Sequence, residues 1–106
     1  MKKAKVYVNG AFAGILMEVE KFRSYEFIYD EAYKGGPVSL TMPVAGKKFI
    51  FDKFPPFFEG LLPEGVLLDS LLRRKKIDRD DLFLQLITVG KDMVGDVSIE
   101  GLEENE

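Results

Sequence analysis

The sequence predicts an α+β fold: a curved antiparallel sheet, or a small open barrel, of about five or six strands with three short helices packed on one side. Three observations favour it. Residues 4–51 contain short stretches in which apolar and polar side chains alternate, residues 56–90 repeat apolar side chains at helical spacing, and residues 94–99 alternate again. Strands and helices are thus segregated along the chain, which favours α+β. A strand made last must return to the sheet, where it closes the sheet or covers an edge.

The first half of the chain predicts the strands. Asn9-Gly10 is typical of a type I′ turn, which needs positive φ at both central residues, and it predicts a hairpin. Gly14, inside the second strand of that hairpin, indicates a bulge or a close approach of two backbones. The expected strands are residues 4–8, 11–18, 24–29, 38–42 and a short one within 45–51.

The second half predicts three helices. Pro56 suits the first turn of the first helix, Asp78 suits the N-cap of the third, and Gly90 suits the C-terminal end of the third. The apolar stripes of the three helices are Phe57, Phe58, Leu61 and Leu62; Val66, Leu67, Leu68, Leu71 and Leu72; and Leu82, Phe83, Leu86 and Ile87. We expect residues 1–101 to form one domain and residues 102–106 to form a frayed acidic tail.

Composition excludes several classes of function. The 106 residues include neither Cys nor His, which rules out disulfides, thiolate metal sites and catalysis by thiol or imidazole. No glycine pattern of a phosphate-binding loop is present, so we expect no nucleotide and no other cofactor. The net charge of −3 does not suit a nucleic-acid-binding protein. The basic run at residues 73–76 is interpreted as a solvated helix end, where cations also suit the helix dipole.

Carboxylates are the main catalytic groups left, and their spacing does not favour a site. Asp80 and Asp81 are adjacent, so on a helix they point about 100° apart; we interpret them as charges that favour a helix N-terminus. Asp92 and Asp96 would lie on one side of a strand, but Asp92 is expected to bond local backbone N–H groups after Gly90. A small enzyme acting through Asp and Lys is therefore the least favoured hypothesis.

Hydropathy bears on where the protein acts. No apolar stretch approaches the ~18 residues that a membrane-spanning helix needs. The basic residues at the N-terminus are not followed by the apolar core of a signal peptide. We expect a cytoplasmic protein that does not bind membranes.

Residues 54–65 contain three Phe, two Leu and three Pro. One interpretation is a buried short helix between rigid turns, and the other is a rigid apolar ridge that contacts another protein. Phe58 and Leu61 are expected to face the core. The expected partner-binding residues are Phe57, Leu62, Pro63, Glu64, Gly65 and Leu68. The aromatic face of residues 25–29 is the next candidate.

Four segments then suggest a family. They are Val6-Tyr7-Val8-Asn9-Gly10 with Ala13-Gly14; Val38 to Pro43, close to "SLSLP"; Phe57 to Gly65, close to "FFDNLLPD/EG"; and Ile87 to Val97, close to "IGRDSVGAV". In this order they resemble the N-terminal domain of HipA-type serine/threonine kinases, the toxins of bacterial HipBA toxin–antitoxin modules. The resemblance spans nearly the whole chain.

The resemblance implies a function. In a full HipA this domain precedes a kinase body, whose ATP-binding and catalytic segments have no counterpart here. Split HipBST modules of this family contain a free-standing, HipS-like form of the domain. The resemblance thus implies a non-catalytic toxin–antitoxin component that binds a HipA/HipT-like kinase core and restrains its activity, in a complex that can include a helix-turn-helix HipB-like protein. The alternatives are a structural subunit that completes a split kinase without inhibiting it, and a fragment of a longer kinase.

Overall fold

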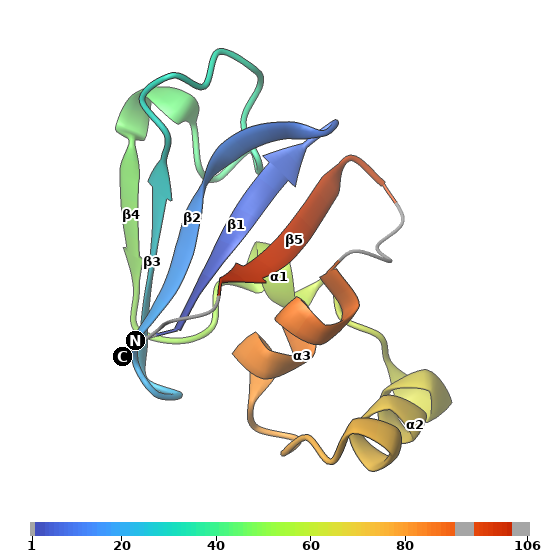
Figure 1. Ribbon diagram of the computed structural model, residues 1–106. Coiled ribbons are helices and arrows are strands. Elements are labelled where there is room, and N and C mark those ends of the chain that lie inside the picture. The colour runs from blue at the N-terminus through green and yellow to red at the C-terminus, as the bar shows by residue number, and fades with distance from the viewer. Residues whose placement is uncertain (1, 91–94, 103–106) are drawn as a thin grey trace.

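The computed structural model describes residues 2–90 and 95–102, and within them one antiparallel sheet of five strands lies against helices on one side (Figure 1). The strand order is β4-β3-β2-β1-β5. The strands are β1 (Lys2–Val8), β2 (Ala11–Glu20), β3 (Ser24–Tyr29), β4 (Lys48–Phe51) and β5 (Val97–Leu102). The predicted α+β class and curved sheet are confirmed, and the sheet is open, with β4 and β5 at its edges.

The first hairpin forms as its sequence predicts. Asn9 and Gly10 have φ of 50° and 82°, as a type I′ turn requires. Gly14 pairs with Val6, whereas the next pair joins Tyr7 to Phe12, so one residue of β2 is left over in a bulge. A Cβ atom at Gly14 would lie 2.3 Å from the carbonyl oxygen of Ile28 on β3. Gly14 therefore marks both a bulge and a close approach of two backbones.

The expected strand at residues 38–42 is absent, and a tight turn stands in its place. Ser39 and Met42 form an isolated bridge, with the Met42 N–H donating to the Ser39 carbonyl at 2.9 Å. The Tyr29 hydroxyl accepts a hydrogen bond from the Val38 N–H at 2.9 Å and donates one to the Met42 carbonyl. This hydroxyl satisfies backbone groups that a neighbouring strand would otherwise satisfy, which is why the alternating pattern gives a turn. Leu40 lies at its exposed tip.

The two remaining strands begin later than expected. A 3₁₀ turn, η1 (Val44–Gly46), precedes β4, so the short strand predicted within residues 45–51 starts at Lys48. The last strand was expected at residues 94–99, and β5 runs instead from Val97 to Leu102 along the length of β1. Leu102, expected in the acidic tail, is thus part of the sheet. Residue 94 and the rest of that tail lie outside the described residues.

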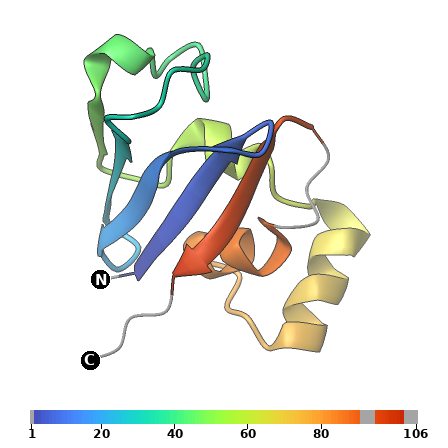
Figure 2. The same cartoon turned by 45° about the horizontal axis from the view of Figure 1, so that its top comes forward.

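The three predicted helices are present as α1 (Pro56–Glu59), α2 (Gly65–Lys75) and α3 (Leu82–Val89). In both views α1 and α3 lie against the sheet, while α2 stands further out on the same side (Figures 1 and 2). The N-cap of α3 is Asp81, whose carboxylate accepts a hydrogen bond from the Leu84 N–H at 3.1 Å. The expected N-cap, Asp78, instead accepts from the Asp80 N–H in the preceding turn.

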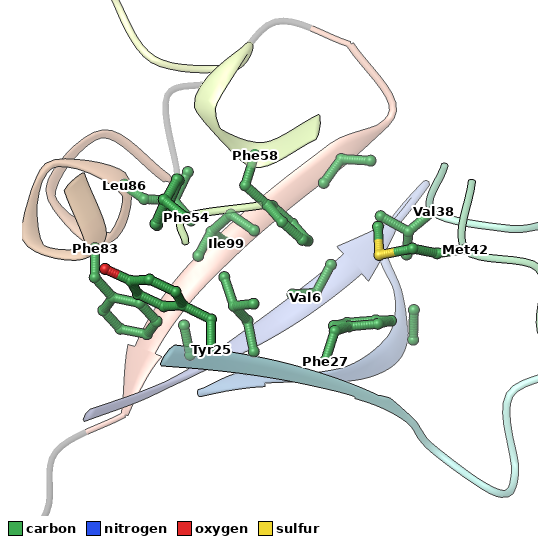
Figure 3. Packing of buried hydrophobic residues seen from close by; sticks show 14 of the residues in the cluster. Val6, Tyr25, Phe27, Val38, Met42, Phe54, Phe58, Phe83, Leu86 and Ile99 are labelled. Carbon is green, nitrogen blue, oxygen red and sulfur yellow. The ribbon is translucent and has the colours of Figure 1, made fainter. Parts of the chain in front are cut away.

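The core lies between the sheet and the helices and is rich in aromatic rings, as Figure 3 shows. Phe27 on β3 meets Phe58 of α1 with ring centroids 6.0 Å apart. Tyr25 meets Phe54 edge-to-face at 5.3 Å, a favoured geometry for aromatic pairs. Phe58 therefore joins α1 to the middle of the sheet, and this contact fixes the position of α1.

Candidate partner-binding surface

Two prolines and a buried ring hold the start of residues 54–68 in place. Pro55 is buried and its carbonyl accepts from the Glu59 N–H at 3.1 Å, while Pro56 occupies the first helical position of α1. Phe58 is fully buried, as the sequence predicts. The helix is only four residues long, so this packing, and not helix propensity, determines its orientation.

Beside α1 lies a shallow hollow of about 380 Å³. Phe57 and Leu61 form part of its wall, together with Val8, Val38 and Val97. Both Phe57 and Leu61 are half-buried and pack against the core. Phe57 is thus partly accessible from the hollow. Leu61, which was expected in the core, lies between the core and the hollow.

The chain leaves α1 and starts α2 through Pro63-Glu64-Gly65. Gly65 has φ of +60°, a conformation that favours glycine, and this places the first turn of α2 away from the body of the domain. Val66 is 84% exposed and Leu67 is 72% exposed in that turn. Exposed apolar residues are ordinary when scattered, but here two of them are adjacent on one helix turn.

The structure separates the six expected partner-binding residues into three groups. Glu64 and Gly65 are exposed, whereas Phe57, Pro63 and Leu68 are half-buried. Leu62 is 9% exposed and belongs to the core cluster, so the expectation that Leu62 faces outward is wrong. The Leu62 N–H bonds to the Glu59 carbonyl, an i+3 turn that tightens the end of α1 and rotates Leu62 inward.

The reserve candidate, the aromatic face of residues 25–29, is also wrong as an accessible surface. Tyr25, Phe27 and Tyr29 are all buried; their rings meet those of Phe54, Phe58 and Tyr33, respectively. The predicted surface extended from Phe57 to Val66, but neither Val66 nor Leu67 was among the expected partner-binding residues, and these two are the most exposed apolar residues of the region. The sequence pattern could have predicted this exposure. Five apolar residues lie within seven positions, which is more than one face of a helix can bury: Val66, Leu67, Leu68, Leu71 and Leu72.

Three buried polar side chains, Glu18, Tyr25 and Asp81, form a cluster between the sheet and the start of α3. The Tyr25 hydroxyl donates a hydrogen bond to Glu18 Oε2 at 3.3 Å, and Glu18 is itself buried. Burial, followed by the negative charge of Glu18, raises the pKa of Tyr25 to about 12. Asp81, also buried, contacts Lys2 Nζ at 3.5 Å and caps α3. The cluster joins α3 to the sheet, and each of these groups has a structural partner.

The candidate carboxylates that the structure describes, Asp80, Asp81 and Asp96, do not form a metal site. Asp81 caps α3 and Asp80 is exposed, in agreement with the interpretation of these acids as helix N-terminal charges. Asp92 lies outside the described residues. Within residues 2–90 and 95–102, no three acidic side chains gather as a metal site requires. In that same part of the chain, no helix has the length and apolarity to cross a membrane.

Comparisons with known proteins agree with this architecture. Residues 4–100 match the model of the HipA N-terminal domain family. An uncharacterised protein of Haemophilus influenzae is 35% identical over 100 residues, which are 94% of this chain and 92% of that protein. A solved structure described as the N-terminal domain of HipA toxin has a TM-score of 0.76 and 31% identity, and the match covers 99% of this chain and 96% of that one. The chain therefore belongs to the HipA N-terminal domain family.

Proposed function

We propose that this chain is a non-catalytic toxin–antitoxin component that binds a HipA/HipT-like serine/threonine kinase core and restrains its activity. The observation that carries the proposal is the exposed apolar turn of Val66 and Leu67, held out by Pro63-Glu64-Gly65 in a domain of the HipA N-terminal family. In a full HipA the corresponding domain is joined to a kinase body, so a kinase body is the natural partner for this surface.

The size of a relative supports a free-standing role. The Haemophilus influenzae protein is matched over 92% of its own length, so that protein contains little besides this domain. A domain that occurs in this form must reach its kinase through a non-covalent contact. Association then needs a surface that stabilises the complex by more than the cost of immobilising two molecules.

The exposed turn of α2 has the properties that such a contact needs. Burying Val66 and Leu67 removes apolar side chains from water, at about 1.5–3 kcal/mol for each fully buried side chain. The neighbouring Phe57 and Leu61 border a hollow that can receive an apolar side chain of the partner. The prolines at positions 55, 56 and 63 restrict the backbone on the N-terminal side of this surface, which lowers the entropy cost of ordering it on binding.

We expect a kinase of this family that lacks the domain to be encoded beside this chain, and the test uses that kinase. We expect the kinase expressed alone to arrest growth and its co-expression with this chain to restore growth. The purified chain should also lower the rate of phosphate transfer from ATP by the purified kinase. A kinase that is active only when this chain is present would instead identify a structural subunit that completes a split enzyme. Absence of any complex between the two purified proteins would overturn both.

A further inference from the structure

The second half of α2 carries a charge pattern that the apolar turn does not explain. Residues three, four and seven apart share a face of a helix, so Val66, Ser70, Arg73 and Arg74 lie along one outward face. Both arginines are exposed. The buried residue of α2, Leu71, lies on the opposite side, toward the core. The outward face therefore begins apolar and ends with two positive charges.

Neither arginine is neutralised within residues 2–90 and 95–102. Asp69 precedes Arg73 by four residues, the spacing of a favourable helical ion pair. Asp69 instead pairs with Arg79 beyond the end of α2, at 2.6 Å between Oδ1 and Nη2. This ion pair ties α2 to the turn before α3 and leaves the outward face positive, in a chain whose net charge is −3.

The helix dipole accounts for positive charge near the end of α2, but not for the distribution of side-chain types. The two arginines occupy the outward face, whereas Lys75 follows buried Leu71 by four residues and Lys76 has left the helix with a φ of 54°. Arginine is enriched at the centres of protein interfaces and lysine is depleted there. A planar guanidinium can also bond a carboxylate through two parallel hydrogen bonds.

We propose that the outward face of α2 docks into a groove of the partner kinase that is apolar at one end and acidic at the other. Val66 occupies the apolar end, with exposed Leu67 at its border, and Arg73 binds a carboxylate about 10 Å further along the helix axis, since seven residues rise about 1.5 Å each; Arg74 lies beside Arg73. Nucleic acid is the disfavoured occupant, because half of this face is apolar and the other half supplies only two arginines. This inference rests on the proposed function and names the chemistry of its partner surface.

The test is a double charge reversal, Arg73→Glu with Arg74→Glu, matched by Lys75→Glu with Lys76→Glu. The two variants change the net charge equally, and both pairs lie at the C-terminal end of α2. We expect the arginine variant to bind the purified kinase more than about tenfold more weakly, mainly through slower association, and to lose the salt dependence of the association rate. The lysine variant should bind within about threefold of the wild-type chain. Thermal melting verifies that both variants are folded. If the arginine variant does not fold, the double variant Arg73→Gln with Arg74→Gln replaces it.

Each other outcome has a distinct meaning. Wild-type binding by a folded arginine variant overturns this inference and leaves the proposed function standing. Equal losses of affinity in the arginine and lysine variants also overturn this inference, because the change in net charge alone then explains the weaker binding. A gel shift of duplex DNA at physiological salt that only the arginine variant abolishes, with kinase binding unchanged, assigns the face to nucleic acid instead. If the wild-type chain does not bind the kinase, the proposed function fails and this inference fails with it.

Discussion

A Cβ atom at Gly90 would lie 2.3 Å from the carbonyl oxygen of Ile99 and 2.7 Å from its Cβ atom. Gly90 follows the last turn of α3, and Ile99 lies in the middle of β5, on its buried face. Gly90 was expected at the C-terminal end of α3 and is found there, with a φ of −57° that any residue can adopt. Glycine is needed there because the helix end touches the strand backbone.

We predict that Gly90→Ala destabilises the protein by about 1–3 kcal/mol, because the added methyl group has no room unless α3 moves away from β5. The matched control is Gly60→Ala. Gly60 also follows a helix, with φ of −64°, and a Cβ atom there would meet nothing closer than 3.4 Å. The control should be neutral or more stable by about 0.4–1 kcal/mol. Urea denaturation of both variants measures the difference, and equal stabilities would show that α3 can shift without cost.

The buried Tyr25 predicts a loss of stability at alkaline pH. Its pKa is raised to about 12 by burial and by the negative charge of Glu18, so the folded state disfavours the tyrosinate. The corresponding stabilisation is complete below about pH 10, the ordinary pKa of tyrosine, and is lost as the pH rises through about 12. Tyr25→Phe should cost about 1 kcal/mol near neutral pH through the lost hydrogen bond, and should lose less stability than the wild type between about pH 10 and 12. The same loss in both proteins would mean that another group controls alkaline unfolding.

Features that depend on neighbouring residues were predictable from the sequence. Asn9-Gly10 determines its own turn, and Gly14 indicated the bulge because only a residue without a side chain fits there. The turn at Ser39 and Met42 was not predictable, because the Tyr29 hydroxyl that stabilises it comes from ten residues earlier in the chain.

For the candidate surface too, features set by neighbouring residues were predictable and features set by distant contacts were not. Its place around Pro63 was predictable, since proline disfavours a helical conformation in the residue before it and so separates the two helical stripes. Which leucine faces outward depends on how far α1 and α2 rotate about their axes, and that rotation is determined by Phe58 and Leu71 in the core. Leu62 and Leu67 have similar hydrophobicity, so hydrophobicity along the sequence could not distinguish the buried one from the exposed one.

We predict that the chain does not bind ATP with Mg²⁺. Helix N-termini are the usual phosphate sites, and here α3 begins at the carboxylate of Asp81 and α2 follows Glu64, so both termini carry a negative charge. A ligand at 100 times its Kd would raise stability by about 2.7 kcal/mol. Thermal melting with and without excess ATP and Mg²⁺ should give the same curve, and a reproducible upward shift would reveal a site.

Leu62 and Leu67 provide the sharpest test of the candidate surface, because they are five residues apart and differ mainly in exposure. Leu62→Glu places a carboxylate in the core and should cost about 3–5 kcal/mol, a large part of the 5–15 kcal/mol typical of such a domain. Leu67→Glu changes a side chain that is already in water and should alter stability by no more than about 0.5 kcal/mol. Leu67→Glu should instead weaken the binding free energy for the kinase, by about 2 kcal/mol if Leu67 is a hot spot. The measurements are thermal melting of both variants and titration of the folded one with the kinase. If Leu67→Glu is folded and binds normally, the interface does not include the first turn of α2. If Leu67→Glu is unfolded, that turn packs more closely than its exposure indicates.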